Sequence, residues 1–329
     1  MEKKLKAGPD WMSKLPPVLW DHPLNSLAIP GSHHSFSFYT DKEARIDRPS
    51  DPIYRQFVEE FGELAGEISY RWTVTQTTTF TQQLNLGIRY FDIRVTARGE
   101  EKEDKNVYLR NGPNVLQALK EFKVWIGMHP QEVIIIDFRV VNKMSPLHHK
   151  YLLANITQDL FEEKLLPYTG NVKGITLRNM WSLAKQIIVI YPKECTYGYS
   201  SVWPNDCTEY VITESQSAKD LFEKLESKYQ HGRSPHMFLC QNGVMTPTRT
   251  YLDTHFHGTL KHKLSMPATK TILYWAMDKD ISFGDVNIIV ADFVESSDFC
   301  NKVVSINTEI KPRPKNHSFE PESRACILL

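Results

Sequence analysis

Short runs of apolar, β-forming residues alternate along the chain with longer segments of helical periodicity. The runs lie at residues 26–29, 87–95, 106–109, 132–140, 186–191, 236–241 and 286–294. Apolar residues recur at helical spacing between several of them, at residues 115–125, 147–165 and 217–229. This alternation is typical of a mostly parallel sheet. Runs such as VIIIDF (133–138) and NIIVADF (287–293) are apolar on both faces, which predicts strands buried between a core and an outer layer of helices.

Strands in this number suit a single TIM-type (β/α) barrel, and an open, doubly wound α/β sheet is the alternative. The length of 329 residues fits either one large barrel or two average domains. Because no repeat or low-complexity block interrupts the alternation, we expect one barrel domain over residues 11–307. The segment 308–329 is proline-rich and charged, and is predicted to be a polar, flexible tail.

Charge and cysteine content argue against several classes of protein. The 39 basic and 39 acidic residues cancel, so no global field favours a nucleic-acid partner, and any anion site must be local. The five cysteines show no CxxC spacing, which argues against a disulfide framework and against a zinc site. The N-terminus carries no apolar signal segment, and the aliphatic runs are strand-sized. We therefore expect a cytoplasmic protein without a membrane span and without a cofactor.

Charged and polar residues finish several of the apolar runs. They are His33 after the first run, Asp92 and Arg94 in the second, Asp137 and Arg139 in the fourth and Asp292 in the last. In a TIM barrel the active site lies at the carboxyl ends of the strands, and buried charges need partners. These residues together predict a polar cluster at the barrel mouth. For any one of them, a purely structural salt bridge is the alternative.

Two adjacent histidines, His33 and His34, follow a Pro30-Gly31 pair near the end of the first run. Successive side chains of an extended strand point to opposite faces, so on regular backbone both imidazoles could not reach one site. The Pro-Gly pair is interpreted as a break that loosens this restriction. A polar loop junction without a function is the alternative interpretation.

Four segments together resemble the phosphatidylinositol-specific phospholipase C X-domain-containing proteins, small eukaryotic relatives of the bacterial phosphatidylinositol phospholipases C. They are LAIPGSHHSFSF from Leu27, WTVTQTTTFTQQLNLGIRYFDIRV from Trp72, the pair Trp203-Pro204 and NIIVADFVESSDF from Asn287. The resemblance runs in order from about residue 11 to about residue 307. It implies a distorted TIM barrel and cleavage of the glycerol–phosphate bond of an inositol phospholipid.

The family's catalytic positions imply roles for three residues. His33 stands where the family has the general base that takes the proton from the inositol 2-hydroxyl, so that this oxygen attacks phosphorus. Asp292 matches the carboxylate that orients this imidazole, and Arg94 is placed to bind the phosphoryl oxygens. At the same mouth we expect three substrate-binding side chains: Asp92, Arg139 and Trp203.

The region around Arg94 also bears on metal dependence. Calcium-dependent relatives of the resembled family have an asparagine and acidic ligands at positions where this chain has His34 and Tyr90, and the strand offers Arg94. A hard divalent ion prefers several oxygen ligands and not a guanidinium. The sequence therefore predicts a metal-independent site, and argues against a metal-requiring glycerophosphodiester phosphodiesterase on the same barrel.

The second catalytic histidine of the family is missing. The family pattern Tyr-Phe-x-His-Gly corresponds here to Tyr108-Leu109-Arg110-Asn111-Gly112, so Asn111 stands where the acid for the leaving group is expected. An amide has no useful acid chemistry near neutral pH, and general acid catalysis is worth roughly 100-fold to 10,000-fold. His34 replaces the aspartate that usually pairs with the missing histidine. Either this acid pair has decayed, which we favour, or His34 donates the proton and Asn111 orients it.

The chain ends in Cys326-Ile327-Leu328-Leu329, the Cys-aliphatic-aliphatic-Leu pattern of geranylgeranyl attachment. A single prenyl chain anchors weakly, so we expect reversible membrane association. The sequence thus predicts a membrane-visiting phosphodiesterase acting on phosphatidylinositol or a related lipid, with weak activity. The alternative is a catalytically silent protein of the same fold that binds inositol phospholipid or serves as a scaffold.

Overall fold

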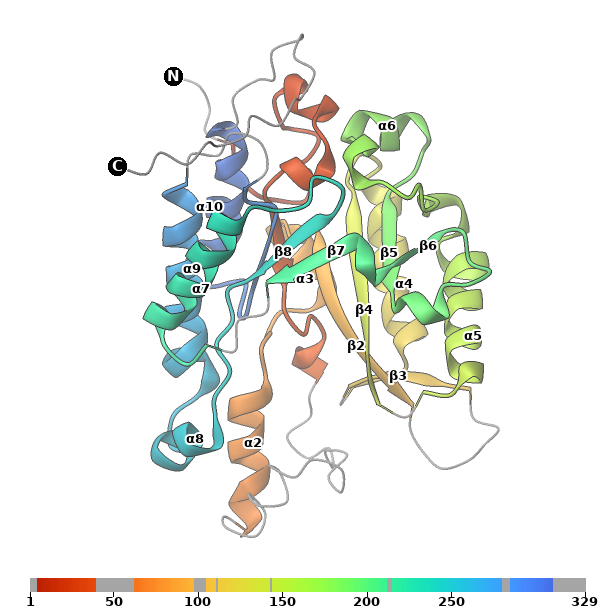
Figure 1. Ribbon diagram of the computed structural model, residues 1–329. Coiled ribbons are helices and arrows are strands. Elements are labelled where there is room, and N and C mark those ends of the chain that lie inside the picture. Colours follow the sequence, from red (N-terminus) through yellow and green to blue (C-terminus); the bar gives the residue numbers. More distant parts are fainter. Residues whose placement is uncertain are drawn as a thin grey trace.

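The computed structural model describes residues 5–39, 62–97, 105–110, 112–142, 144–211, 215–279 and 285–309. The strands are β1 (Ile29–Ser32), β2 (Tyr90–Ala97), β3 (Val107–Leu109), β4 (Ile134–Asn142), β5 (Ile187–Tyr191), β6 (Val202–Pro204), β7 (Thr208–Val211), β8 (Phe238–Asn242) and β9 (Ile288–Ala291). The α-helices are α2 (Ala65–Thr73), α3 (Phe80–Leu86), α4 (Val115–Met128), α5 (Pro146–Ala154), α6 (Leu177–Ser182), α7 (Ala218–His231), α8 (Arg249–His255), α9 (Met266–Met277) and α10 (Phe299–Ile306). Two π-helical stretches, Asn155–Leu160 and Lys261–Ser265, adjoin α5 and α9 (Figure 1).

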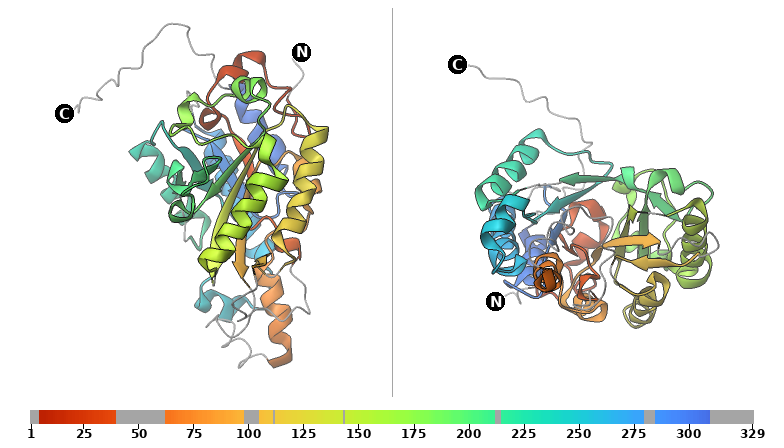
Figure 2. Two further views of the ribbon diagram at one scale, coloured as in Figure 1. Left: turned by 90° about the vertical axis from the view of Figure 1, so that its right-hand side faces the viewer. Right: turned by 90° about the horizontal axis from the view of Figure 1, so that it is seen from below.

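All nine strands belong to one curled sheet with the order β6-β5-β4-β2-β1-β9-β8-β7, and β3 adds to β2 as an antiparallel strand. The order follows the chain round the sheet without the reversal that defines a doubly wound sheet. Figure 2 shows the sheet curling upon itself with helices on its outer side. The two ends of this strand order are β6 and β7. These strands are consecutive in the chain, but within the described residues no hydrogen-bonded ladder joins them. The predicted single, distorted TIM-type barrel is therefore confirmed, and it is open at one seam.

Two short strands at this seam were not expected from the sequence. β6 has three residues and β7 four, and a 3-10 turn at Asn205–Cys207 separates them. Such short strands present no apolar run that stands out from a loop. The run at 106–109 does form a strand, but β3 pairs back on β2 as a hairpin and not as a member of the parallel series.

The Pro30-Gly31 pair lies inside β1, and the expectation that it breaks the strand was wrong. The Pro30 carbonyl accepts a hydrogen bond from the Arg89 N–H at 2.9 Å, so the proline still contributes an acceptor to the sheet. A Cβ atom added at Gly31 would lie 2.9 Å from Tyr90 Cδ1 and 3.0 Å from Val290 Cγ2. Glycine is needed here because the neighbouring strands approach closely.

A buried ion pair closes the amino end of the barrel. The Arg89 guanidinium donates from Nε and Nη2 to one carboxylate oxygen of Glu132, at 2.9 and 2.7 Å, and both side chains are inaccessible to solvent. Its remaining N–H groups donate to backbone carbonyls, including those of Gly8 and Pro9, so the pair also holds the N-terminal segment. Burial raises the pKa of Glu132, against the opposing effect of Arg89. This end of a barrel serves stability, and the opposite end carries the site.

Several sequence predictions lie outside the described residues. These are the tail beyond residue 309, its Cys326 and the Asn111 position. The domain boundary at residue 307 therefore stays a prediction. Within the described ranges, no helix combines the length and apolarity that a bilayer crossing requires.

Candidate active site

The register of three parallel strands brings the predicted polar residues together. β1 lies between β2 and β9, and its last residue is aligned with Phe91 on one side and Ala291 on the other. The residues that follow these positions are His33, Asp92 and Asp292. Because the carboxyl ends of parallel strands meet at one edge of a sheet, the three side chains converge at the barrel mouth.

His33 is held between a carboxylate and a guanidinium. Its Nδ1 lies 2.7 Å from Asp292 Oδ1, and its Nε2 lies 3.0 Å from Arg94 Nη2. A guanidinium can only donate, so Nε2 accepts and Nδ1 carries the proton that is donated to Asp292. The other Asp292 oxygen accepts from the Ser265 hydroxyl at 2.7 Å, which fixes the buried carboxylate. In this tautomer the unprotonated Nε2 faces Arg94 and the mouth.

Asp92 lies beneath this group and holds two arginines. Its Oδ2 is 3.3 Å from Arg94 Nη2, and its Oδ1 is 3.3 Å from Arg139 Nε. Burial would raise the pKa of Asp92, but the charges of Arg94 and Arg139 outweigh it and hold the pKa well below the usual range. Asp92 is thus an ionised, buried counter-charge. From the sequence, Asp92 was expected to bind substrate. In the structure Asp92 lies at the site, where it forms ion pairs with Arg94 and Arg139.

Arg139 borders a second group of side chains inside the barrel. Its guanidinium lies over the Tyr210 ring at 4.3 Å, and Asp137 accepts the hydroxyls of Tyr90 and Tyr210 at 2.5 and 2.8 Å. Tyr210 belongs to β7, the strand that the sequence did not reveal. Trp203 is different: it is fully buried, and its indole N–H donates to a backbone carbonyl at 2.9 Å. The structure brings Arg139 to the cluster and leaves Trp203 in the core.

His34 reaches the same site through a left-handed backbone conformation, with φ of 43°. Its ring stacks on that of His33, with centroids 4.8 Å apart and planes inclined by 13°. Burial, followed by the charge of Arg94, lowers the pKa of His34 well below its usual value. Within the described part of the chain, its Nε2 is buried and has no hydrogen-bond partner. A neutral imidazole is a poor proton donor.

Gln76 holds the two strand ends that carry the histidine–carboxylate pair, and the sequence did not single it out. Its Nε2 donates to the carbonyls of His33 and Ala291, both at 3.0 Å, and its Oε1 accepts from the Val294 N–H at 3.2 Å. The neighbouring Thr75 hydroxyl also donates to the His33 carbonyl, at 3.1 Å. The only sequence signal was a polar stretch, TVTQTTT, directly before a helix.

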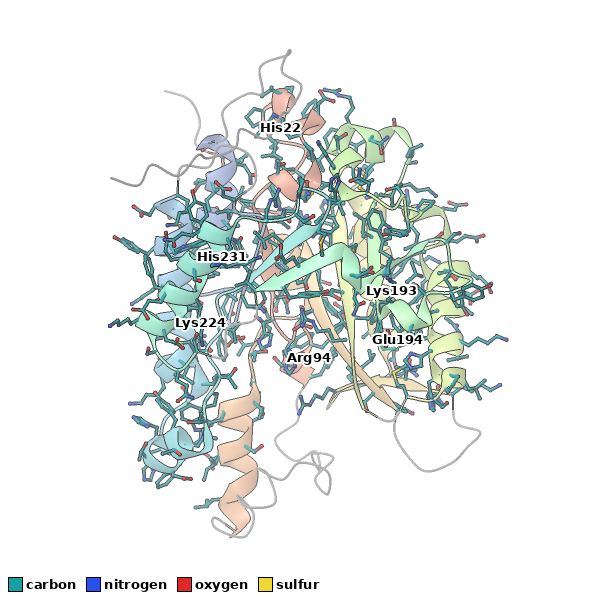
Figure 3. The ribbon with its side chains drawn as sticks, viewed as in Figure 1. His22, Arg94, Lys193, Glu194, Lys224 and His231 are labelled. Atoms are coloured by element: carbon teal, nitrogen blue, oxygen red, sulfur yellow. The ribbon has the colours of Figure 1, made fainter. Side chains whose placement is uncertain are left out.

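The cluster opens into a cavity of about 280 Å³. The charged and imidazole side chains that line it are His33, His34, Arg94, Arg110 and Asp292. Arg110 follows β3, and its N–H donates to the Arg94 carbonyl at 2.9 Å. Figure 3 shows Arg94 at the lower opening of the curled sheet. Among the described residues, no three or more His, Cys, Asp or Glu side chains gather in a way that could hold a metal ion.

Comparison with known proteins identifies relatives along nearly the whole chain, although no family model matches it. It is 32% identical to PI-PLC X domain-containing protein 2 of Mus musculus, over 92% of this chain and 89% of that protein. It is 30% identical to human PI-PLC X domain-containing protein 1, over 92% and 94% of the two chains. The fold is similar to that of the phosphatidylinositol-specific phospholipase C of Listeria monocytogenes (TM-score 0.58, 19% identity, 92% and 98% covered). For the Staphylococcus aureus enzyme the TM-score is 0.62 at 16% identity, with 94% and 100% covered. The chain belongs to the PI-PLC X domain-containing proteins.

Proposed function

We propose that the chain is a metal-independent phosphodiesterase of the phospholipase C type that acts on phosphatidylinositol or a related inositol phospholipid. The observation that carries this proposal is the geometry of His33, with Nδ1 2.7 Å from Asp292 Oδ1 and Nε2 3.0 Å from Arg94 Nη2. A base in this state is ready to accept a hydroxyl proton, and a fixed guanidinium beside it can bind the phosphoryl oxygens.

In the proposed reaction His33 Nε2 takes the proton of the inositol 2-hydroxyl as this oxygen bonds to phosphorus. The bond from phosphorus to the glycerol oxygen breaks, which yields a cyclic inositol phosphate and diacylglycerol. Asp292 stabilises the imidazolium that forms, and Arg94 stabilises the charge on the phosphoryl oxygens. Arg139, held by Asp92, is proposed to bind the inositol headgroup. No described side chain is assigned as the acid, so the glycerol oxygen takes its proton from water, and the proton on His33 neutralises the hydroxide that remains. The lack of a positioned acid predicts a slow reaction.

The alternative function is lipid binding without turnover. Two observations favour it: Asn111 stands where the family has its acid, and the lowered pKa of His34 keeps this imidazole neutral. General acid catalysis contributes roughly 100-fold to 10,000-fold, so its loss could reduce the rate below a useful level. The headgroup site would then remain as a receptor for inositol phospholipid.

The decisive experiment is incubation of the purified protein with phosphatidylinositol vesicles in excess EDTA, followed by ³¹P NMR of the soluble products. The proposal predicts a cyclic phosphodiester signal that is absent with His33→Ala and present with His231→Ala, an exposed histidine on α7. Vesicle binding without any product would support the alternative. Strict dependence on added calcium, or neither binding nor turnover, would overturn the proposal.

We also infer that the protein is cytoplasmic and associates reversibly with membranes. A lipid substrate requires access to a bilayer, and a prenyl group on Cys326 would provide it. The local basic residues at the cavity, and not the net charge of zero, would select the anionic headgroup.

A further inference from the structure

Three arginines lie in one row across neighbouring strands at the barrel mouth. β2 and β4 are parallel, and their register aligns Arg94 with Arg139. β2 and β3 are antiparallel, and their register continues by one residue to align Arg94 with Arg110, whose N–H donates to the Arg94 carbonyl at 2.9 Å. Side chains directly opposite each other on paired strands lie on the same face of the sheet. Arg110 therefore adds a third cation to the face that carries Arg94.

The turn after β3 positions Arg110 at the cavity. The Leu109 N–H donates to the Pro113 carbonyl at 3.0 Å, and the Gly112 N–H donates to the Leu109 carbonyl at 2.9 Å. A Cβ atom added at Gly112 would lie 3.0 Å from Leu109 Cβ, so this turn packs closely against β3. The backbone of Arg110 is thus fixed by contacts to both β2 and β3, and its side chain lines the same cavity as Arg94.

The carboxylates that neutralise this row belong to its other end. Asp92 forms ion pairs with Arg94 and Arg139, and Asp137 lies 3.7 Å from Arg139 Nη2. These carboxylates come from β2 and β4, whereas the three residues of β3 are uncharged. Like charges directly opposite each other on paired strands repel. The end of the row formed by Arg94 and Arg110 therefore favours a negatively charged ligand.

Arg110 also lies beside the two positions at which the family protonates its leaving group. Its neighbour in sequence is Asn111, which stands where the family has its second histidine. His34 stands where the family has the aspartate that pairs with this histidine, and it lines the same cavity. Burial has the largest effect in lowering the pKa of His34, and the charges of Arg94 and Arg110 lower it further. A guanidinium thus faces the place from which the acid is missing.

We propose that Arg110 contacts the leaving glycerol oxygen and stabilises the charge that develops on it, in place of the missing acid. The inference rests on the proposed function and names a further residue of its reaction. A guanidinium stays protonated near neutral pH, so Arg110 does not transfer a proton. It supplies a charge-assisted hydrogen bond to the oxygen in the transition state.

The proposed step balances without a protein acid. The bond from the inositol 2-oxygen to phosphorus forms, and the electron pair of the bond between phosphorus and glycerol oxygen stays on the glycerol oxygen. Arg110 stabilises this negative charge until water protonates the oxygen. The proton that His33 has taken from the 2-hydroxyl then neutralises the hydroxide. The products are a cyclic inositol phosphate and diacylglycerol, and no water is consumed.

The test compares Arg110→Gln with wild type, in EDTA, on phosphatidylinositol and on an inositol phosphate ester with an activated phenolate leaving group. Loss of one group that stabilises developing charge should lower kcat on phosphatidylinositol about 100-fold. A phenolate leaves without such help, so kcat on the activated ester should fall less than about threefold. Arg110→Lys keeps a positive charge and should hold kcat on phosphatidylinositol within about tenfold of wild type.

The matched control is Arg178→Gln, which removes the same charge from an exposed pair with Asp21. Arg178 lies on α6, at the opposite end of the barrel from β3 in Figure 1, and does not line the cavity. It should leave kcat unchanged on both substrates.

A second measurement does not depend on turnover. Binding of inorganic phosphate is followed by ³¹P NMR titration in EDTA. Arg110→Gln should weaken this binding about tenfold or more, because a hydrogen bond to a charged group is lost. Arg178→Gln should bind phosphate as wild type does. Circular dichroism confirms that each variant is folded.

The outcomes separate this inference from the proposed function. Equal losses of kcat on both substrates, or phosphate binding by Arg110→Gln as tight as that of wild type, would overturn the role of Arg110. The proposed function would then stand, because His33 and Arg94 would still account for turnover. Hydrolysis of neither substrate by wild type would contradict the proposed function, and the role of Arg110 in the leaving-group step would fall with it.

Discussion

Replacing Gln76 by glutamate tests whether this buried amide holds the candidate site together. The side chain is fully buried and bridges the ends of β1 and β9 through the carbonyls of His33 and Ala291. A carboxylate keeps the acceptor for the Val294 N–H but loses both donors. When ionised, it would face two carbonyl oxygens in a buried position. Such a group binds a proton more tightly in the folded state, so its folded-state pKa is raised.

The raised pKa of the introduced glutamate determines how the free energy of unfolding of Gln76→Glu changes with pH. A protonated glutamate at position 76 retains one donor, so below about pH 4.3 the loss is about 1 kcal/mol, the value of one hydrogen bond. Above that pH the unfolded chain releases the proton first, and stability falls by about 1.4 kcal/mol per pH unit up to the folded-state pKa. A pKa raised to about 7 gives a deficit of about 5 kcal/mol at pH 8, against a typical total of about 5–15 kcal/mol.

The assay is urea unfolding followed by circular dichroism from pH 4.5 to pH 8, with wild type measured at each pH. The matched control is Gln82→Glu, an exposed position where the new side chain can still accept the Thr79 N–H at the start of α3. The control should stay within about 0.5 kcal/mol of wild type. A deficit for Gln76→Glu that is independent of pH, or no larger than that of the control, would refute the bridging role.

Three further sets of substitutions test the buried ion pair of the barrel, the predicted prenyl anchor and the missing acid pair. Glu132→Gln leaves a buried arginine without its counter-charge and should cost about 3–5 kcal/mol in urea unfolding, whereas Asp21→Asn in an exposed ion pair should cost less than about 1 kcal/mol. Cys326→Ser should move the protein from membranes to the soluble fraction in cells that prenylate proteins, with an unchanged melting temperature. Asn111→His with His34→Asp should raise hydrolysis of the natural lipid far more than that of a substrate with an activated phenolate leaving group. Equal gains on both substrates, or loss of natural-lipid activity in His34→Ala alone, would contradict decay of the acid pair.

The sequence predicted those features that depend on long apolar runs and on strand ends. The runs containing Asp92, Asp137 and Asp292 became central parallel strands, and their shared edge brought His33 and the two arginines together. The short strands β6 and β7 escaped prediction because three or four residues carry no clear periodicity. Trp203 illustrates the same difficulty, since an aromatic residue at a strand end can face either the mouth or the core.

Other parts of the site depend on backbone angles and long-range contacts. The positive φ of His34, and not the Pro30-Gly31 pair, places both imidazoles on one side, and sequence gives little warning of a left-handed histidine. Gln76 is 43 residues from His33 along the chain, and its role arises only when the segment 74–76 packs across the strand ends. Polar residues that bridge backbone groups of distant strands leave no periodic signal.

The charges at the barrel mouth indicate how the cluster of His33, Arg94 and Asp292 can persist when the expected acid pair is absent. Relative to the family pattern, His34 replaces an aspartate and Asn111 replaces a histidine, so a negative group and its cationic partner are absent together. The paired change leaves the local net charge as it was. The ion pair between Arg94 and the buried Asp92 therefore needs no further compensating charge. The contacts among His33, Asp292 and Arg94 do not involve residue 34 or residue 111. Under the proposed function they can therefore persist without the acid, as expected of a receptor for inositol phospholipid that turns over slowly.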